Sequence, residues 1–233
     1  MHIFFPESKK GTQFSISGEE LKHLLVRRVQ IGEKVGIIWE NKLYLCKVVE
    51  KNKKKALCEI EEEIETKIPK LKLTLYQAVT IELKTFETIV QKATELGAAE
   101  LVPLITERSF RRREVILKKM DRWKKVSKEA MKQSGRTYEL SIREPALLED
   151  LEPTSDLNIL LDNFYEGKPI GSLELSSVES VSVVVGPEGG FRREEGEHLR
   201  SKGFLSVKLE PHVLRADTAA TVGVGIIMNL AGS

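Results

Sequence analysis

Apolar and polar residues alternate along much of the first 68 residues, as they do in antiparallel strands with one buried face. The segments predicted as strands on this basis are 3–5, 35–39, 43–49 and 56–64. Ser17, followed three residues later by Glu20, is typical of a helix N-cap with its capping-box partner. Leu21, Leu24 and Leu25 then form the predicted buried stripe of a short helix. We therefore predict a small β-rich domain over residues 1–68.

The periodicity changes after residue 69, where short apolar runs alternate with segments of helical spacing. The runs predicted as strands are 71–79, 99–105, 157–161, 181–185 and 205–209. The segments predicted as helices are 84–96, 114–134, 194–202 and 217–230, the last with Asp217 as its cap. Strands that alternate with helices are typical of an α/β fold with a mainly parallel sheet. We predict such a domain over residues 69–233.

The formal net charge of +2 conceals one strongly basic segment. Residues 108–136 carry 12 Lys or Arg against 3 Asp or Glu, whereas residues 1–68 carry 13 against 11. A concentrated basic segment is typical of a surface that binds a phosphate-rich polyanion. The exposed face of a long helix would explain the same charges without any ligand.

Simple counts argue against several other classes of protein. The longest nearly apolar stretch, 221–232, is shorter than the roughly 20 residues that cross a bilayer. No signal-peptide pattern is evident at the N-terminus, and Cys46 and Cys58 form no CxxC pair, which fits a reducing compartment. The histidines are scattered, so no metal is expected. We predict a cytoplasmic protein without a membrane partner.

The strongest local signal joins a buried strand to a helix. Val185 ends an apolar run, and the sequence Gly-Pro-Glu-Gly-Gly follows at 186–190. Three glycines in five residues let the backbone turn tightly and approach a ligand closely. Ligands of open α/β sheets bind at the carboxyl ends of the strands, where this loop is expected. An ordinary strand–helix turn is the alternative, and the glycine spacing fits neither GxGxxG nor a P-loop.

Two further stretches carry groups suited to an anionic partner. Arg215 follows the strand 205–209, and its guanidinium has the donor geometry for phosphate or a developing anion. A structural ion pair with Glu210 or Asp217 would explain this arginine equally well. The stretch 107–113 places four arginines around Phe110, which suits RNA phosphates and a stacked base.

Taken in chain order, these stretches resemble the ribosomal small-subunit methyltransferase E family, which methylates N3 of a uridine in 16S rRNA. The matching residues are Gln91–Gly97, Glu107–Ser109, Arg122-Trp123, Glu129-Ala130, Gln133-Ser134, Val183–Phe191 with GPEGGF, Leu214-Arg215 and Asp217–Ala219. The resemblance covers essentially the whole chain, and Leu21–Gly36 is similar to the family's PUA-like barrel. Two departures are Leu209–Val213, with Glu210-Pro211-His212 inside it, where the family usually has Leu-Gly before its Ile-Leu-Arg, and Asp217, where Glu is common.

The resemblance implies a SPOUT-type α/β domain with a C-terminal trefoil knot, preceded by a PUA-like RNA-binding β-barrel. It also implies S-adenosylmethionine as methyl donor, 16S rRNA or the small ribosomal subunit as partner, and a homodimer. The implied cofactor-binding residues are Leu161, Gly186, Pro187, Glu188, Gly190, Leu209, Pro211, Leu214 and Ala219. The predicted RNA contacts are Arg27, Arg28, Arg108, Arg111, Arg112, Arg113 and Arg136.

Arg215 is the predicted catalytic residue, because a cation beside the uridine would favour its N3 anion. The general base stays open between Asp217 and a water molecule. Two other functions also stay open: methylation of a guanosine or a ribose 2′-hydroxyl, since the glycine-rich loop does not read the base, and RNA binding without catalysis. Binding of S-adenosylmethionine would separate the enzymes from the binding module.

Overall fold

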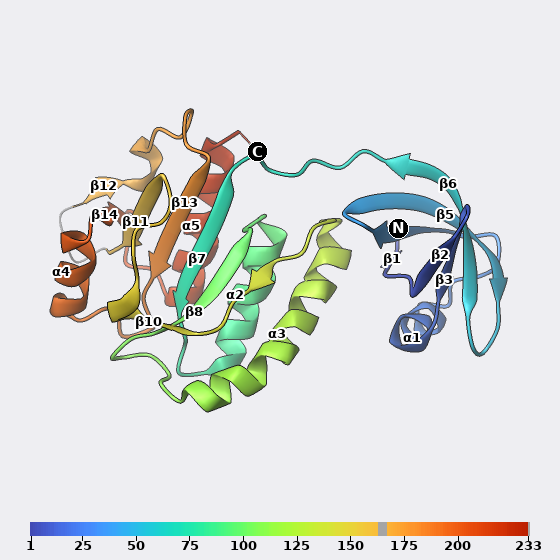
Figure 1. The fold of residues 1–233 in the computed structure, drawn as a ribbon, viewed down its shortest axis with the longest axis horizontal. Helices are drawn as coiled ribbons and strands as arrows, with labels where there is room; N and C mark the ends of the chain where they lie inside the picture. Colours follow the sequence, from blue (N-terminus) through green and yellow to red (C-terminus); the bar gives the residue numbers. More distant parts are fainter. Residues whose placement is uncertain (163–166, 233) are drawn as a thin grey trace. The chain divides into compact units, whose positions relative to one another are not determined.

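The computed structural model describes residues 1–162 and 167–232, and the chain divides into two compact units (Figure 1). Unit 1 comprises Met1–Lys67 and Met131–Glu139, and unit 2 comprises Ile68–Ala130 and Leu140–Ser233. The chain therefore leaves unit 1 near residue 68, returns to it for nine residues, and ends in unit 2.

Unit 1 is built on a curled, mixed sheet of six strands in the order β1-β4-β5-β6-β3-β2. Only the β1–β4 pair is parallel among the pairs of this sheet that the structure describes. The strands are β1 (Ile3–Phe4), β2 (Ser8–Lys10), β3 (Gln13–Ile16), β4 (Lys34–Trp39), β5 (Lys42–Lys51) and β6 (Ala56–Ile64). The four predicted strands are present. β2 and β3 were not predicted, because β2 is wholly polar and both are short.

Helix α1 (Gly18–Val26) packs Leu21 and Leu24 into the core of this sheet, whereas Leu25 is 43% exposed, contrary to prediction. Ser17 is the N-cap as predicted, but its side chain makes no capping bond and donates to Glu7 instead. The predicted capping box is therefore wrong. The Glu20 carboxylate accepts a hydrogen bond from the backbone N–H of Phe5 at 3.1 Å.

Unit 2 contains an eight-stranded sheet whose described pairs are all parallel, which confirms the predicted α/β class. The order is β10-β8-β7-β13-β11-β14-β12, with β9 also beside β8. The strands are β7 (Lys72–Ala78), β8 (Glu100–Ile105), β9 (Ser141–Ile142), β10 (Ala146–Leu147), β11 (Leu157–Leu161), β12 (Lys168–Pro169), β13 (Ser180–Val185) and β14 (Leu205–Lys208).

All four predicted helices of the second half are present. They are α2 (Leu83–Glu95), α3 (Arg113–Ser134), α4 (Arg193–Ser201) and α5 (Ala216–Leu230), with short 3-10 turns η1 (Leu148–Asp150) and η2 (Ile170–Ser172). The N-cap of α5 is Arg215, so the prediction that Asp217 caps this helix is wrong. Asp217 lies in the first turn, where a carboxylate still suits the positive end of the helix dipole.

Helix α5 packs against α2 and against β7 and β13, and in Figure 1 α5 lies behind these two strands. It also contacts η2, which belongs to the connection between β11 and β13. Strand β14 lies beside β11 in the sheet. The chain then continues into α5, which packs against β13 and β7 on the other side of β11. The predicted trefoil knot would form around this connection; part of the connection lies outside the described residues, and the knot stays a prediction.

Candidate functional site

A pocket of about 180 Å³ lies at the carboxyl ends of the central strands of unit 2. Two segments form most of it: residues 186–192 after β13, which we call the glycine loop, and residues 209–215 after β14. Eight of the nine predicted cofactor residues line it: Leu161, Gly186, Pro187, Glu188, Gly190, Leu209, Leu214 and Ala219. The structure thus brings together residues up to 58 positions apart; their role as ligand contacts stays a prediction.

The ninth predicted residue, Pro211, is exposed and lies outside the lining of this pocket. It follows a cis peptide bond to Glu210. The lining residues outside the predicted cofactor-binding set are Asp162, Val185, Gly189, Phe191, Val213 and Ala216. Asp162 had a usable signal, since it is the polar residue directly after the apolar strand β11, at the ligand-binding end of the sheet.

The glycine loop needs two of its glycines for its own geometry. Gly190 has a φ of +65°, in the left-handed region that favours glycine, and its N–H donates to the Pro187 carbonyl at 2.9 Å. A side chain at Gly186 would come within 3.2 Å of the Phe191 ring. The tight turn inferred from the sequence is therefore present, and it folds Phe191 back over the start of the loop.

Three contacts hold the glycine loop from neighbouring parts of the sheet. At the end of β7, the fully buried Gln77 donates its amide N–H to the Gly186 carbonyl at 3.2 Å. The Glu188 carboxylate accepts from the backbone N–H of Ile81, with oxygen distances of 3.1 and 3.2 Å. Arg108 donates to the Gly189 carbonyl at 2.8 Å. The protein's own groups therefore fix the conformation of the glycine loop.

The residues that follow β8 are fastened to the start of α4. We call residues 106–113 the arginine loop. The Glu195 carboxylate accepts from the backbone N–H of Glu107 and from that of Arg192, both at 2.8 Å. Arg192 also forms an ion pair with the Glu107 carboxylate at 2.8 Å. The arginine loop and the glycine loop therefore share one hydrogen-bonded framework.

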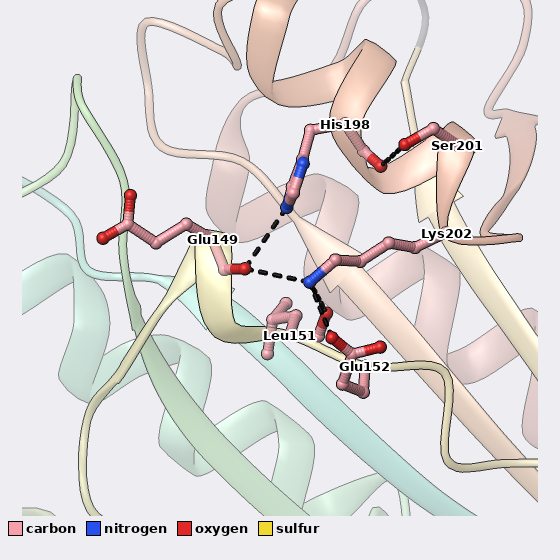
Figure 2. A network of polar contacts seen from close by, with 6 residues as sticks. All are labelled: Glu149, Leu151, Glu152, His198, Ser201 and Lys202. Carbon is pink, nitrogen blue, oxygen red and sulfur yellow. Dashed lines mark hydrogen bonds and ion pairs between the residues drawn. The ribbon is translucent and has the colours of Figure 1, made fainter.

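The other end of α4 is fixed by a lysine that uses all three of its N–H donors (Figure 2). Lys202 donates to the carbonyls of Glu149 and Leu151 at 2.9 and 2.8 Å, and to the Glu152 carboxylate at 2.8 Å. His198 also contacts the Glu149 carbonyl, at 3.2 Å. A positive charge at this end of α4 suits the helix dipole and ties the helix to η1.

The pocket combines apolar walls with carboxylates. Leu161, Leu209 and Leu214 supply aliphatic surface, whereas Asp162, 8% exposed, supplies a carboxylate that pairs with Arg200 at 3.2 Å. Aliphatic walls suit the face of a heterocyclic base, and glycine backbone allows close approach to polar edges. The Asp162 carboxylate, although paired with Arg200, has further lone pairs that can accept a hydrogen bond from a hydroxyl group. These features fit a nucleoside.

Arg215 is exposed and lies between two pocket-lining residues, Leu214 and Ala216. No hydrogen bond or ion pair joins its side chain to the described residues, so the structural pairing with Glu210 or Asp217 is not observed. Arg215 therefore adjoins the pocket lining along the chain, with its side chain exposed.

Four of the seven predicted RNA-contact arginines are exposed, and their side chains form no hydrogen bond or ion pair with the described residues. Arg27 and Arg28 follow α1 in unit 1, and Arg111 and Arg112 belong to the arginine loop of unit 2. The Arg112 guanidinium lies 5.4 Å from the centre of the Phe110 ring. This pairing presents charge and an aromatic face together, as the sequence indicated.

The other three arginines bind protein groups. Besides Arg108, Arg113 donates to the Pro145 carbonyl at 2.6 Å and to Glu144 at 3.1 Å, which fastens the start of α3. Arg136 is only 7% exposed, and burial lowers its pKa to about 10. It donates to the carbonyls of Tyr138 and Glu139. A buried guanidinium cannot form a docking surface, so the assignment of Arg136 to RNA contact is corrected to a structural role.

Comparison with known proteins decides the family. The RNA methyltransferase domain family matches residues 66–228, and the RNA methyltransferase PUA domain family matches residues 16–61. Ribosomal RNA small subunit methyltransferase E of Aquifex aeolicus is 50% identical over 229 residues, which cover 98% of this chain and 100% of that protein. The chain belongs to the ribosomal RNA small subunit methyltransferase E family. The family member from Bacillus subtilis is 28% identical, with 94% and 91% of the two chains covered.

Solved structures of related proteins share the fold described above. A methyltransferase from Legionella pneumophila, in complex with the bound cofactor SAM, is 29% identical and superposes with a TM-score of 0.85 over 97% of this chain and 96% of that one. The family member from Neisseria gonorrhoeae, bound to S-adenosyl methionine, has the same fold, with a TM-score of 0.87 at 24% identity over 99% and 98%. Across the residues that the structure describes, we find no helix with the length and apolarity needed to span a membrane.

Proposed function

We propose that the protein transfers a methyl group from S-adenosylmethionine to N3 of a uridine in 16S rRNA of the small ribosomal subunit, in the cytoplasm. The observation that carries the proposal is the pocket between the glycine loop and the segment 209–215, in a chain that matches the Aquifex enzyme over its full length. The SAM-bound Legionella relative supports the choice of donor. We assign residues 69–233 to methyl transfer and residues 1–68 to RNA binding.

The residues of the pocket fit S-adenosylmethionine. Leu161, Leu209, Leu214 and Ala219 would flank the adenine, and the backbone of the glycine loop would approach its polar groups. Asp162 would face the ribose or the cationic end of the molecule. When bound, this cofactor supplies a methyl group on a positively charged sulfur, which makes the methyl carbon electrophilic.

The chain's own contribution to the reaction is positional and electrostatic. A pre-formed pocket that holds two reactants in line contributes roughly 7–11 kcal/mol through proximity and orientation. Neutral uridine is a poor nucleophile at N3, so its proton must leave. Arg215, exposed and adjacent in the chain to two pocket-lining residues, stabilises the negative charge that develops on the uridine oxygens. Asp217 or a water molecule accepts the proton.

A second copy of the chain is proposed to complete the pocket. The cavity of about 180 Å³ is smaller than the about 300–1,000 Å³ of typical ligand sites. Val213, which lines the pocket, is 65% exposed, and Leu230 at the end of α5 is 42% exposed. Val222 and Ile226 on α5 are also only partly buried. Light scattering should give twice the chain mass; a monomer at micromolar concentration contradicts this part of the proposal.

Nucleoside mass spectrometry tests the proposed reaction. Small ribosomal subunits and free 16S rRNA from a strain lacking the enzyme are incubated with the protein and isotope-labelled S-adenosylmethionine. We expect label in 3-methyluridine. Label in a guanosine base or in a ribose would favour a related RNA methyltransferase, and RNA binding without label would favour a module that only binds.

A further inference from the structure

We propose that Arg108 is a positioning residue for the glycine loop and not an RNA contact. The inference rests on the proposed function, since it concerns the loop that would hold the methyl donor. It separates Arg108 from Arg111 and Arg112, which lie a few residues further along the same basic segment.

The Arg108 side chain reaches across to residues some 80 positions later in the sequence. Its Nη1 group donates to the Gly189 carbonyl at 2.8 Å and lies 3.5 Å from the Phe191 carbonyl. A side chain at Gly189 would come within 3.4 Å of Arg108 Cδ, so the aliphatic part of Arg108 packs beside that glycine. Gly189 and Phe191 both line the pocket. One guanidinium thus fixes two carbonyls of the pocket wall.

The backbone that carries Arg108 is itself held in place. The Ser109 hydroxyl accepts from the Thr106 N–H at 2.8 Å and donates to the Thr106 carbonyl at 3.0 Å, and it is buried. The N–H of Phe110 donates to the Val79 carbonyl at 2.9 Å. Glu107, the residue before Arg108, is held at the start of α4, because its N–H donates to Glu195 and its carboxylate pairs with Arg192. Arg108 therefore starts from a rigid turn and needs little ordering to reach the glycine loop.

Unlike the side chain of Arg108, the side chains of Arg111 and Arg112 do not bind the glycine loop. Both are exposed, and neither makes a hydrogen bond or ion pair with residues 1–162 or 167–232. They provide matched controls, because they are the same residue type in the same segment.

Removal of the Arg108 side chain should loosen the glycine loop before the ligand arrives. The free loop then samples more conformations, and binding must order it again, which weakens affinity. We expect Arg108→Ala to raise the Kd for S-adenosylmethionine about tenfold, and Arg108→Lys, which keeps one donor and the charge, to recover part of that loss. The dependence of RNA affinity on salt should keep its slope, because no phosphate contact is removed.

The experiment compares the full-length protein with the Arg108→Ala, Arg108→Lys, Arg111→Ala and Arg112→Ala variants. Calorimetry gives the Kd for S-adenosylmethionine, a salt titration of RNA binding gives the slope, and thermal unfolding verifies that each variant is folded. Arg111→Ala and Arg112→Ala should bind the cofactor like the unaltered protein and each lower the salt slope by about 1.

Unchanged cofactor affinity in folded Arg108→Ala overturns the inference. So does a salt slope lowered by about 1 in this variant, as in the controls. If the unaltered protein binds no S-adenosylmethionine, the proposed function fails first and the inference fails with it. If the unaltered protein and Arg108→Ala bind S-adenosylmethionine with equal affinity, this inference is refuted and the proposed function is not.

Discussion

At the scale of single residues, the basic segment shows how much identical side chains can differ. The sequence presents Arg108, Arg111, Arg112 and Arg113 as one cluster, and composition alone cannot separate them. In the structure Arg108 binds the glycine loop and Arg113 binds the Pro145 carbonyl, whereas the side chains of Arg111 and Arg112 face solvent. Those partners come from other strands and loops, so spacing along the chain could not reveal them.

The catalytic assignment is tested at Arg215. Arg215→Ala should lower turnover by about 100-fold, because one electrostatic group at a developing charge contributes about 10²–10³ in rate. Its effect on the Kd for S-adenosylmethionine should be small, since Arg215 lies outside the pocket lining. A methyl-transfer assay at saturating cofactor, combined with calorimetry, measures both quantities. Equal turnover in the variant would remove the assignment.

At the scale of elements, hydrophobic periodicity predicted the long helices and strands, because each has a buried face with a regular repeat. Helix α2 illustrates this, with Phe86, Ile89, Val90 and Ala93 buried on one side. Strands β9, β10 and β12 have two residues each and show no repeat that a pattern could detect. They form because neighbouring strands offer unpaired backbone groups. The caps were predicted least well, since Ser17 and Glu20 bond to tertiary partners.

The attachment of α4 to η1 should contribute to stability. Lys202→Met removes the donor to two carbonyls and one carboxylate while it keeps the aliphatic stem. We expect the free energy of unfolding to fall by about 1–3 kcal/mol, because polar groups lose a charged partner. Urea unfolding measures the change. Lys118→Met, at an exposed position on α3, is the matched control and should change stability by less than about 0.5 kcal/mol.

The starts of β11 and β13 are joined by Asp156, which gives stability a defined pH dependence. Hydrogen bonds from the Ser180 hydroxyl and from the backbone N–H groups of Glu179 and Ser180 hold the pKa of Asp156 below its ordinary value of 3.8. A lowered pKa stabilises the folded state above the ordinary value, and this contribution is lost as the pH falls through the folded-state pKa.

Asp156→Asn should therefore be less stable than the unaltered protein at neutral pH, and the difference should shrink as the pH falls below about 4. Urea unfolding at several pH values between neutral and acid measures it. A difference that stays constant over this range would contradict the assigned role of the carboxylate.

At the scale of the whole molecule, the sequence predicted the α/β class and the chain order of the longer strands and helices. It did not predict that residues 131–139 group with the first unit, or that β13 lies between β7 and β11. Both depend on contacts between segments far apart in the chain. More of the pocket lining could be predicted than of the loops around it. Periodicity could not show that the segments near Gly186 and Leu214 lie together, but the family resemblance implied it.

RNA docking is the property that the exposed arginines are expected to determine. Replacing Arg111 and Arg112 together by alanine should weaken RNA binding and reduce the slope of log affinity against log salt by about 2, since each arginine is expected to neutralise one phosphate. Arg113→Ala should leave that slope unchanged, because Arg113 already binds Pro145 and Glu144. Filter binding across a salt series measures both. An unchanged slope in the double variant would mean that another surface binds the RNA.

The proposed function depends on where S-adenosylmethionine binds to the protein. A crystal structure of the protein with this molecule tests that directly. We expect one molecule of S-adenosylmethionine per chain. Its adenine should lie among Leu161, Leu209 and Leu214, and its polar groups should contact the backbone of the glycine loop. Crystals that show the molecule at another place, or that show none at saturating concentration, would contradict the account.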